Sequence, residues 1–430
     1  MKAKYCITKG FKILIAQFIL SFIGFAVGCK WGLNIENNKW SHLIYNDIKI
    51  ADIDIGGKTK EEARSIIKSK YIDAVINKKL YVTVDDKIYS EYNSNLIKGN
   101  DMDNVIDEAF NFGKDLNAFE KHRLIRMGSK KTFSLNFNCD YEIVNAFTKN
   151  IEKEVNKEPV NASIAMKTEG AIKIDAEING YKLEKEKLDK YISDKINTSA
   201  NMNIHIDAPV QKIDASVTQT KLSLINSCIA SFSTSFQSSS YMRSNNIDIS
   251  VKAINGRLLF PGETFSFNDM LGERTKERGY MEAPVIINNK VESGIGGGIC
   301  QVSSTLYNAI LKSGIQDIRR TNHSLPSSYV ELGLDATVDW QNIDFKFINT
   351  LDYPMYIEMY TKSKNLYINI YSNSDLNKRK YIIENDVNEY NNTYNVKVTR
   401  KTYESGNLIN SELISDDIYT LGSPVLKKRF

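Results

Sequence analysis

The chain has 430 residues, with 56 Lys and Arg against 52 Asp and Glu, so its formal net charge is +4. Charged residues make up 25% and hydrophobic residues 42%, ordinary values that exclude collagen-like, low-complexity and wholly disordered chains. The near balance of charge argues against a dedicated nucleic-acid-binding protein. The length predicts two or three domains, each able to bury a core without a disulfide scaffold. Five cysteines are an odd number, so at least one lies outside any intramolecular disulfide.

The N-terminus is typical of a membrane-targeting segment. Four lysines and no acidic residue precede the apolar run ILIAQFILSFIGFAVGC. Because the positive flank comes first, we predict a cytoplasmic tail over 1–12, a transmembrane anchor over 13–29 and an irregular linker over 30–42. The rest of the chain would then be the extracytoplasmic part of a single-pass protein. A lipoprotein signal ending at Cys29 and a cleaved signal peptide are the alternatives.

Two small α+β units are predicted next, over 43–115 and 116–212. The first begins with alternating residues in IKIADIDIGG, followed by Thr59 and Glu62 at the spacing of a helix capping box. The later stretch IKIDAEING also precedes a charged amphipathic helix, which indicates a weak internal duplication. Neither unit contains a group of residues that suggests chemistry.

The composition changes near residue 228, where polar and aromatic residues and then glycine turns become dense. Strand-like runs at 283–287, 335–348 and 354–371 predict a mainly β domain over 213–375 with one clear helix. The tail over 376–430 alternates charged and β-branched residues, which predicts a C-terminal β segment. The fold class expected for the whole chain is therefore α+β.

The glycine run GIGGGIC, which ends on Cys300, is the most informative stretch. Gln301 to Ser313 is predicted to be a helix, because apolar residues recur on one face and Gly314 follows as a cap. Cys300 would therefore lie at a helix N-terminus, where the partial positive charge favours a thiolate. Unpaired backbone N–H groups there could stabilise an oxyanion. Ser303 and Ser304 are alternative nucleophiles, but they fall inside the helix.

A thiolate nucleophile needs a base, and His323 is the one histidine of the chain within this domain. A third group should orient the imidazole, and Asp335 and Asp339 are both candidates. Arg319 or Arg320 could bind a substrate carboxylate through two hydrogen bonds. No second Cys or His lies at ligand spacing, so we expect no metal and no cofactor.

Between Ser231 and Glu358 the sequence resembles the VanW family. The motifs that carry the resemblance are FSTSF, PGETFSFN, GERTKERGY, GIGGGICQVSSTLYNA, NHS and GLDATVDW, together with Arg243 and the following NNI. The two upstream units are similar to the peptidoglycan-binding repeats that accompany this family. The tail is similar to β segments that often close such proteins.

The resemblance implies a cell-envelope protein of a Gram-positive bacterium with peptidoglycan stem peptides as partners. Some members of the family are associated with L,D-transpeptidation, an activity that suits a Cys300 nucleophile with His323 as base. The alternatives are a non-catalytic peptidoglycan-binding or glycopeptide-resistance accessory protein, and a hydrolase. Candidate substrate-binding residues are Gly296, Gly297, Gly298, Gln301, Ser303, Arg319, Arg320, Asn322 and Ser324.

Overall fold

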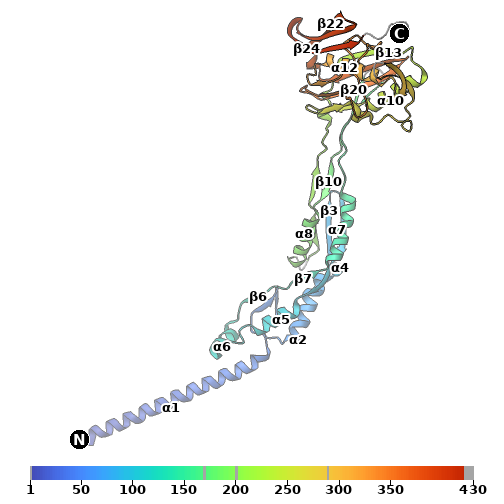
Figure 1. The fold of residues 1–430 in the computed structure, drawn as a ribbon. Helices are drawn as coiled ribbons and strands as arrows, with labels where there is room; N and C mark the ends of the chain where they lie inside the picture. The colour runs from blue at the N-terminus through green and yellow to red at the C-terminus, as the bar shows by residue number, and fades with distance from the viewer. Residues whose placement is uncertain (1, 168–170, 199–201, 288–289, 421–430) are drawn as a thin grey trace. The chain divides into compact units, whose positions relative to one another are not determined.

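The computed structural model describes residues 2–167, 171–198, 202–287 and 290–420 (Figure 1). It has a mixed helix-and-strand fold, with a mainly β C-terminal region. The chain divides into two compact units. The first comprises Met1–Pro159 and Asn179–Asp214, and the second Val160–Ile178 and Ala215–Phe430.

The N-terminal helix α1 runs unbroken over Lys2–Lys39. It forms most of a candidate membrane span, Phe11–His42, whose most apolar window has a mean hydropathy of 2.0 and is not buried. A helix of this length and composition is the type found in membrane anchors and signal peptides. The irregular linker predicted over 30–42 is wrong, because the helix continues to Lys39. Its last turns are held by Glu36, which forms an ion pair with Arg126 at 3.0 Å and lies 2.6 Å from His122 Nδ1.

The rest of the first unit consists of short strands and helices around one core. The Thr59 capping box is present at the start of α2, with Glu62 bonded back to the Thr59 N–H. The elements that follow α1 are η1 (Trp40–His42), β1 (Ile48–Ile50), β2 (Ile53–Asp54), α2 (Lys60–Ile67), η2 (Lys68–Ile72), α3 (Asp73–Ile76), β3 (Lys79–Val84), β4 (Lys87–Tyr92), α4 (Asn93–Leu96), β5 (Ile97–Asn100), α5 (Met102–Asn111), α6 (Ala118–Met127), β6 (Lys131–Phe133), β7 (Phe137–Cys139), α7 (Tyr141–Val155), β10 (Gly180–Leu183), α8 (Lys185–Thr198), β11 (Ile204–Asp207) and β12 (Val210–Ile213).

Strand pairing in this unit differs from the two separate units predicted over 43–115 and 116–212. β11 pairs in parallel with β3, and β1 pairs in parallel with β6, so both pairings cross the expected boundary. Strands this short bury their apolar residues only by pairing with distant partners. The two similar stretches also pair differently, because β9 (Ile172–Asp175) forms a hairpin with β8 (Ser163–Met166) in the second unit.

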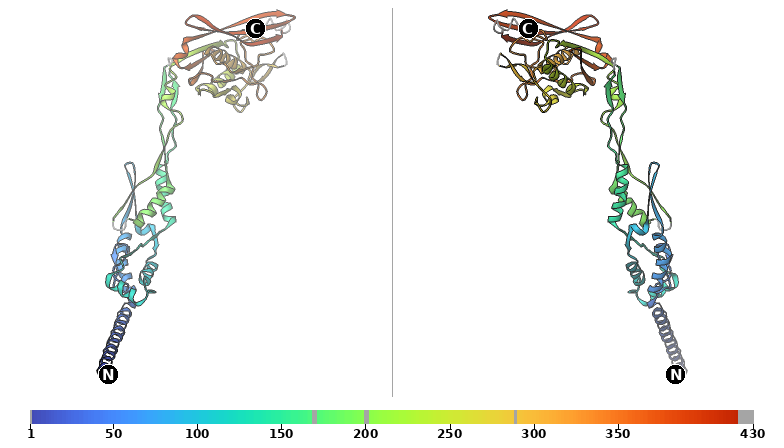
Figure 2. Two further views of the ribbon diagram at one scale, coloured as in Figure 1. Left: turned by 90° about the vertical axis from the view of Figure 1, so that its left-hand side faces the viewer. Right: turned by 90° about the vertical axis from the view of Figure 1, so that its right-hand side faces the viewer.

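The second unit is built around helix α12 (Ile299–Ser313), which lies between two antiparallel sheets (Figure 1). One sheet has the order β13-β21-β20-β14 and the other β22-β23-β24, seen in red in Figure 2. Besides β8 and β9, its elements are α9 (Gln219–Leu222), β13 (Ser227–Ser235), α10 (Tyr241–Ile254), β14 (Arg257–Leu259), β15 (Thr264–Ser266), α11 (Phe267–Leu271), β16 (Glu282–Ile287), β17 (Lys290–Ile295), β18 (Ile318–Arg319), β19 (Lys346–Ile348), β20 (Met355–Lys362), β21 (Asn365–Ser372), η3 (Ser374–Lys378), β22 (Arg379–Tyr390), β23 (Thr393–Glu404) and β24 (Asn407–Thr420).

Almost every side chain of α12 is buried, because both sheets cover it. Its C-terminal end is held by Arg400 of β23, whose guanidinium donates to the carbonyls of Leu311 at 3.3 Å and Ile315 at 2.6 Å. A cation at this end of a helix interacts favourably with the helix dipole. The predicted C-terminal β segment is thus a layer packed on α12, within the same compact unit as residues 215–375.

The strand predicted over 335–348 is wrong for most of its length. Only β19 and a single bridge between Asp339 and Ile343 have strand pairing there. The Ser303 hydroxyl donates to the Ala336 carbonyl at 2.6 Å, and the Ala336 N–H donates to Ser304 at 2.9 Å. Helix side chains therefore satisfy backbone groups of this segment, and it needs no neighbouring strand.

Candidate active site

The glycine turn before α12 places Cys300 as the second residue of the helix. Gly296 and Gly298 have φ values of 86° and 107°, which favour glycine. Gly297 packs so closely on β16 that an added Cβ would lie 2.6 Å from the Pro284 carbonyl oxygen. Gly296, Gly297 and Gly298 are therefore needed to bring the start of α12 against β16 and α10.

The Cys300 thiol is half-buried and donates to the carbonyl oxygen of Val338 at 3.5 Å. The Ser304 hydroxyl donates to the Cys300 carbonyl at 2.7 Å, while the Ser303 hydroxyl donates to the Ala336 carbonyl. Both serines are fully buried, so they hold the 335–338 segment on the first turn of α12 and are poor candidates for nucleophiles.

His323 lies in the loop between β18 and β19, and its side chain interacts with the Cys300 thiol. Asp335 fixes the imidazole: its Oδ2 is 2.5 Å from Nδ1 and accepts the His323 backbone N–H at 2.6 Å. A carboxylate on Nδ1 leaves Nε2 for the thiol, as in nucleophile–His–acid triads. The structure thus brings together Cys300, His323 and Asp335.

Electrostatics in this group favour a thiolate and an imidazolium. Burial alone would raise the pKa of Cys300, but the His323 interaction, aided by the charge of Arg274, holds this pKa below its usual value. Burial alone would lower the pKa of His323, but Asp335 and Cys300 outweigh it and raise this pKa to about 10. By contrast, burial raises the pKa of the Cys139 and Cys228 thiols.

Asp335, the acid of the Cys300–His323–Asp335 group, is held by a residue from the C-terminal sheet. Tyr419 of β24 donates its hydroxyl to Asp335 Oδ1 at 2.5 Å and accepts the Gly333 N–H at 2.9 Å. Asp335 therefore uses one oxygen for His323 and the other for Tyr419. Tyr419 is a positioning residue, because it acts on the imidazole through Asp335.

Tyr419→Phe should lower the free energy of unfolding by about 1–3 kcal/mol, because a buried hydrogen bond to a charged group is lost. Reactivity of Cys300 toward iodoacetamide at neutral pH should also fall, since Asp335 holds His323 less firmly. Thermal unfolding and alkylation rates measure the two effects. Tyr390→Phe, at an exposed tyrosine of β22, is the matched control. If Tyr419→Phe and Tyr390→Phe had the same free energy of unfolding, this role of Tyr419 would be contradicted.

The other predicted site residues occupy different places. Asp339 is exposed and accepts a hydrogen bond from Asn342 at 2.6 Å, so Asp335 is the acid at His323. Arg320 is buried and donates at 2.6 Å to Asp417. Arg319, whose side chain is 76% exposed, is therefore the accessible one of the two arginines.

Most of the other candidate substrate-binding residues are buried or bonded within the fold: Gly296, Gly297, Gln301 (to Thr234 and Ser235), Ser303 and Asn322 (to the His323 and Ile418 carbonyls). Ser324 is exposed, and Gly298 is half-buried.

Several residues near Cys300 were missed as site residues from the sequence. Arg243 packs on Gly298 and Arg274 on Gly296. Tyr329 interacts with Ser304 and has its pKa raised well above the usual value, by burial and by the charges of Cys300 and Asp335. The arginines lie in motifs quoted for the family resemblance, which was a usable signal. No sequence signal pointed to Tyr419, since it is separated from Asp335 by 84 positions.

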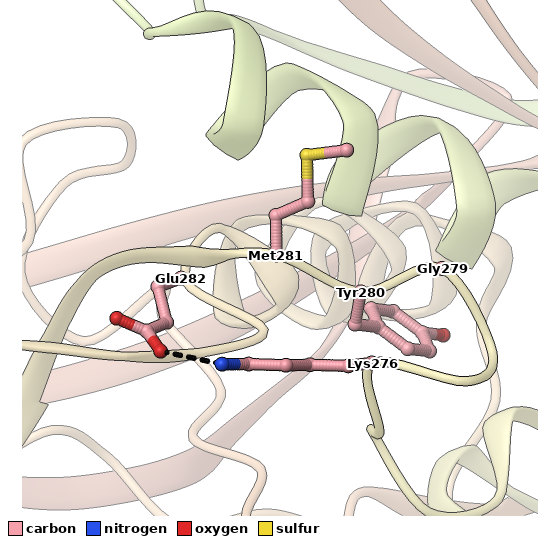
Figure 3. Close-up of a pocket in the computed structure, with 5 residues that line it drawn as sticks. All are labelled: Lys276, Gly279, Tyr280, Met281 and Glu282. Atoms are coloured by element: carbon pink, nitrogen blue, oxygen red, sulfur yellow. Dashed lines mark ion pairs between the residues drawn. The ribbon is translucent and has the colours of Figure 1, made fainter.

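A shallow, open pocket of about 350 Å³ lies beside the site, in the loop before β16 (Figure 3). Lys276, Gly279, Tyr280, Met281 and Glu282 line it, and Lys276 forms a 3.0 Å ion pair with Glu282. The Met281 carbonyl accepts the Gly296 N–H at 3.1 Å, so this loop is fixed to the glycine turn. None of the three residues of the Cys300 group lines the pocket.

Comparison with known proteins gives the family. Residues 242–371 match the model described as "VanW like protein", and residues 92–205 match "Putative peptidoglycan binding domain". The "Uncharacterized protein YoaR" of Bacillus subtilis is 36% identical over 242 residues, 56% of this chain and 78% of that protein. The "Vancomycin B-type resistance protein VanW" of Enterococcus faecalis is 34% identical over 112 residues, 25% of this chain and 41% of that protein. No solved structure matches. The resemblance predicted from the sequence is confirmed, and the chain belongs to the VanW family, with a peptidoglycan-binding region upstream of the VanW-like domain.

Proposed function

We propose that the protein is a cysteine-dependent L,D-transpeptidase that crosslinks peptidoglycan stem peptides. The observation that carries the proposal is the Cys300–His323–Asp335 arrangement, in which a half-buried thiol of lowered pKa interacts with an imidazole fixed by a carboxylate. The peptidoglycan-binding region supports a location at the cell wall. The apolar helix α1 supports attachment to the membrane through a single N-terminal segment.

In the proposed first step the Cys300 thiolate attacks the carbonyl carbon of the third stem residue. A C–S bond forms, and the carbonyl oxygen becomes an oxyanion at the N-terminus of α12, where the partial positive charge of the helix dipole stabilises it. His323 gives its Nε2 proton to the nitrogen of the terminal D-Ala, the C–N bond breaks, and D-Ala leaves. The product is a thioester on Cys300.

In the second step an amine of a neighbouring stem peptide attacks the thioester. His323, now neutral, takes a proton from that amine, and Cys300 leaves as the thiolate. Asp335 keeps Nδ1 protonated in both steps, so that Nε2 faces the reacting atoms. The new amide bond between the two stem peptides replaces the amide bond broken in the first step. The transfer therefore needs no external energy source.

Cys300→Ala should abolish crosslinking, because no other group in the site can form the thioester. The full-length chain in detergent is incubated with tetrapeptide muropeptides, and dimers and released D-Ala are measured by mass spectrometry. Cys228→Ala is the matched control, since Cys228 is a free thiol on β13. Crosslinking that survives Cys300→Ala would overturn the proposal.

Two other results would point to other functions. Release of D-Ala without dimers would favour a hydrolase, in which water replaces the acceptor amine. Retention on purified cell wall by both wild type and Cys300→Ala, with no product, would favour a non-catalytic binding or accessory protein. That second function is favoured by the peptidoglycan-binding region itself.

A further inference from the structure

Two arginine side chains lie on the glycine turn that leads to Cys300. A Cβ added to Gly296 would meet Arg274 Cβ and Cγ at 3.5 Å, and one added to Gly298 would meet Arg243 Cγ at 2.9 Å. The guanidinium groups have limited partners: Arg243 Nη1 donates to Ser239 at 2.6 Å, and Arg274 Nη2 donates to Asn268 at 2.6 Å. Two positive charges are therefore held against the segment that positions the thiol.

Two buried donors in this place have no partner among the described residues. They are Arg274 Nη1 and Trp340 Nε1. The two side chains are adjacent, since the Arg274 guanidinium lies 5.6 Å from the centre of the Trp340 ring. A buried donor without an acceptor is costly, and most such groups in folded proteins are paired. An acceptor from outside the chain would satisfy both.

The neighbouring carboxylates are already engaged. Asp344 accepts from the Ser266 hydroxyl at 2.6 Å and from the Asn268 N–H at 2.9 Å. Asp339 accepts from the Asn342 side chain at 2.6 Å and is exposed. Neither forms an ion pair with Arg274, although both lie near it. The cationic donors on the turn are therefore left for a ligand.

We propose that Arg274 and Trp340, with Arg243 across the glycine turn, form a subsite that binds a carboxylate of the acyl donor next to Cys300. This inference rests on the proposed function. In a tetrapeptide donor, the terminal carboxylate is separated from the attacked carbonyl carbon by only the amide nitrogen and one Cα. A guanidinium and an indole N–H give such a carboxylate charge-assisted hydrogen bonds. The subsite would select donors whose last residue carries a free carboxylate.

The test compares two reagents of similar size that differ in charge. Iodoacetate carries a carboxylate and iodoacetamide does not, and both alkylate the thiolate of Cys300 with loss of iodide. The rates on the full-length chain are normalised to free cysteine and expressed as an iodoacetate-to-iodoacetamide ratio. Arg274→Gln should lower this ratio by on the order of tenfold, since one charged hydrogen bond is lost. Trp340→Phe should lower it less, because an N–H is lost but the ring is kept.

Lys276→Gln is the matched control, because it removes one positive charge from an exposed position in the same loop. Its ratio should equal that of the wild type. A ratio unchanged in both Arg274→Gln and Trp340→Phe would overturn the subsite. If Arg274→Gln fails to fold, Trp340→Phe alone decides.

The subsite and the proposed function can fail separately. A lowered ratio without any crosslinking would keep the carboxylate subsite and remove the transpeptidase assignment. Crosslinking that requires Cys300, with an unchanged ratio in both variants, would keep the activity and place donor recognition elsewhere.

Discussion

His323→Ala should lower the rate of stem-peptide crosslinking by about 10²- to 10⁴-fold, the range associated with loss of a general acid–base group. Two effects combine in this variant. The thiol loses the partner that lowers its pKa, and the leaving amine loses its proton donor. The matched control is His205→Ala, at an exposed histidine of β11 that stacks on Tyr81 in the other compact unit.

Alkylation across pH separates the two effects. In the wild type, Cys300 should react with iodoacetamide at a lower pH than Cys228, whose pKa burial raises. In His323→Ala this difference should shrink, because burial then raises the pKa of Cys300 with only the charge of Arg274 and the Val338 hydrogen bond to oppose it. An unchanged alkylation profile in His323→Ala would contradict the thiolate–imidazolium pair.

The sign of the pH dependence follows from His323. Its pKa of about 10 lies above the ordinary value of 6.5, so protonation of His323 stabilises the fold fully below about pH 6.5. This contribution is lost as the pH rises from there to about 10. Crosslinking should likewise fall as the pH passes about 10, when His323 can no longer protonate the leaving amine. A rate that keeps rising beyond that pH would exclude His323 as the acid.

The sequence was informative where a structural rule acts locally. The helix after the glycine run could be predicted because apolar residues recur at helical spacing and Gly314 ends it, and α12 occupies that segment. The capping box of Thr59 and Glu62 at the start of α2 likewise follows from the spacing of these two residues. Both features depend on neighbours within a few residues.

The features that could not be predicted from the sequence depend on contacts between distant segments. Asp335 and Asp339 are four positions apart in one loop, and the choice between them is made by His323 and by Tyr419 of β24. Hydroxyl groups of α12 hold the backbone at Ala336, so an apparent strand becomes a loop. A single sequence contains no local pattern for either contact.

The arginine pair Arg319 and Arg320 also could not be resolved from the sequence, because contacts with a distant strand bury one residue and leave the other exposed. The two are identical in type and adjacent in sequence, and both were candidates for binding a carboxylate. In the structure Arg320 and Asp417 form a buried ion pair whose side chains are each 6% exposed, and Arg320 also donates to the Gly333 carbonyl at 2.7 Å. This carboxylate belongs to β24 of the protein itself, two residues before Tyr419.

Arg320→Met should therefore act on stability, with a loss of about 3–5 kcal/mol in the free energy of unfolding, because Asp417 is left buried without its partner. The double variant Arg320→Met with Asp417→Leu should recover much of that loss, since no unpaired charge remains. Arg319→Met, at the exposed neighbour, should change stability by no more than about 0.5 kcal/mol. Thermal and denaturant unfolding of the full-length chain measure all three. If Arg320→Met unfolded like the wild type but lost donor binding, Arg320 would bind substrate as first expected from the sequence. The predicted order of stabilities instead makes Arg320 the residue that fastens β24, and with it Tyr419, to the loop that carries Asp335.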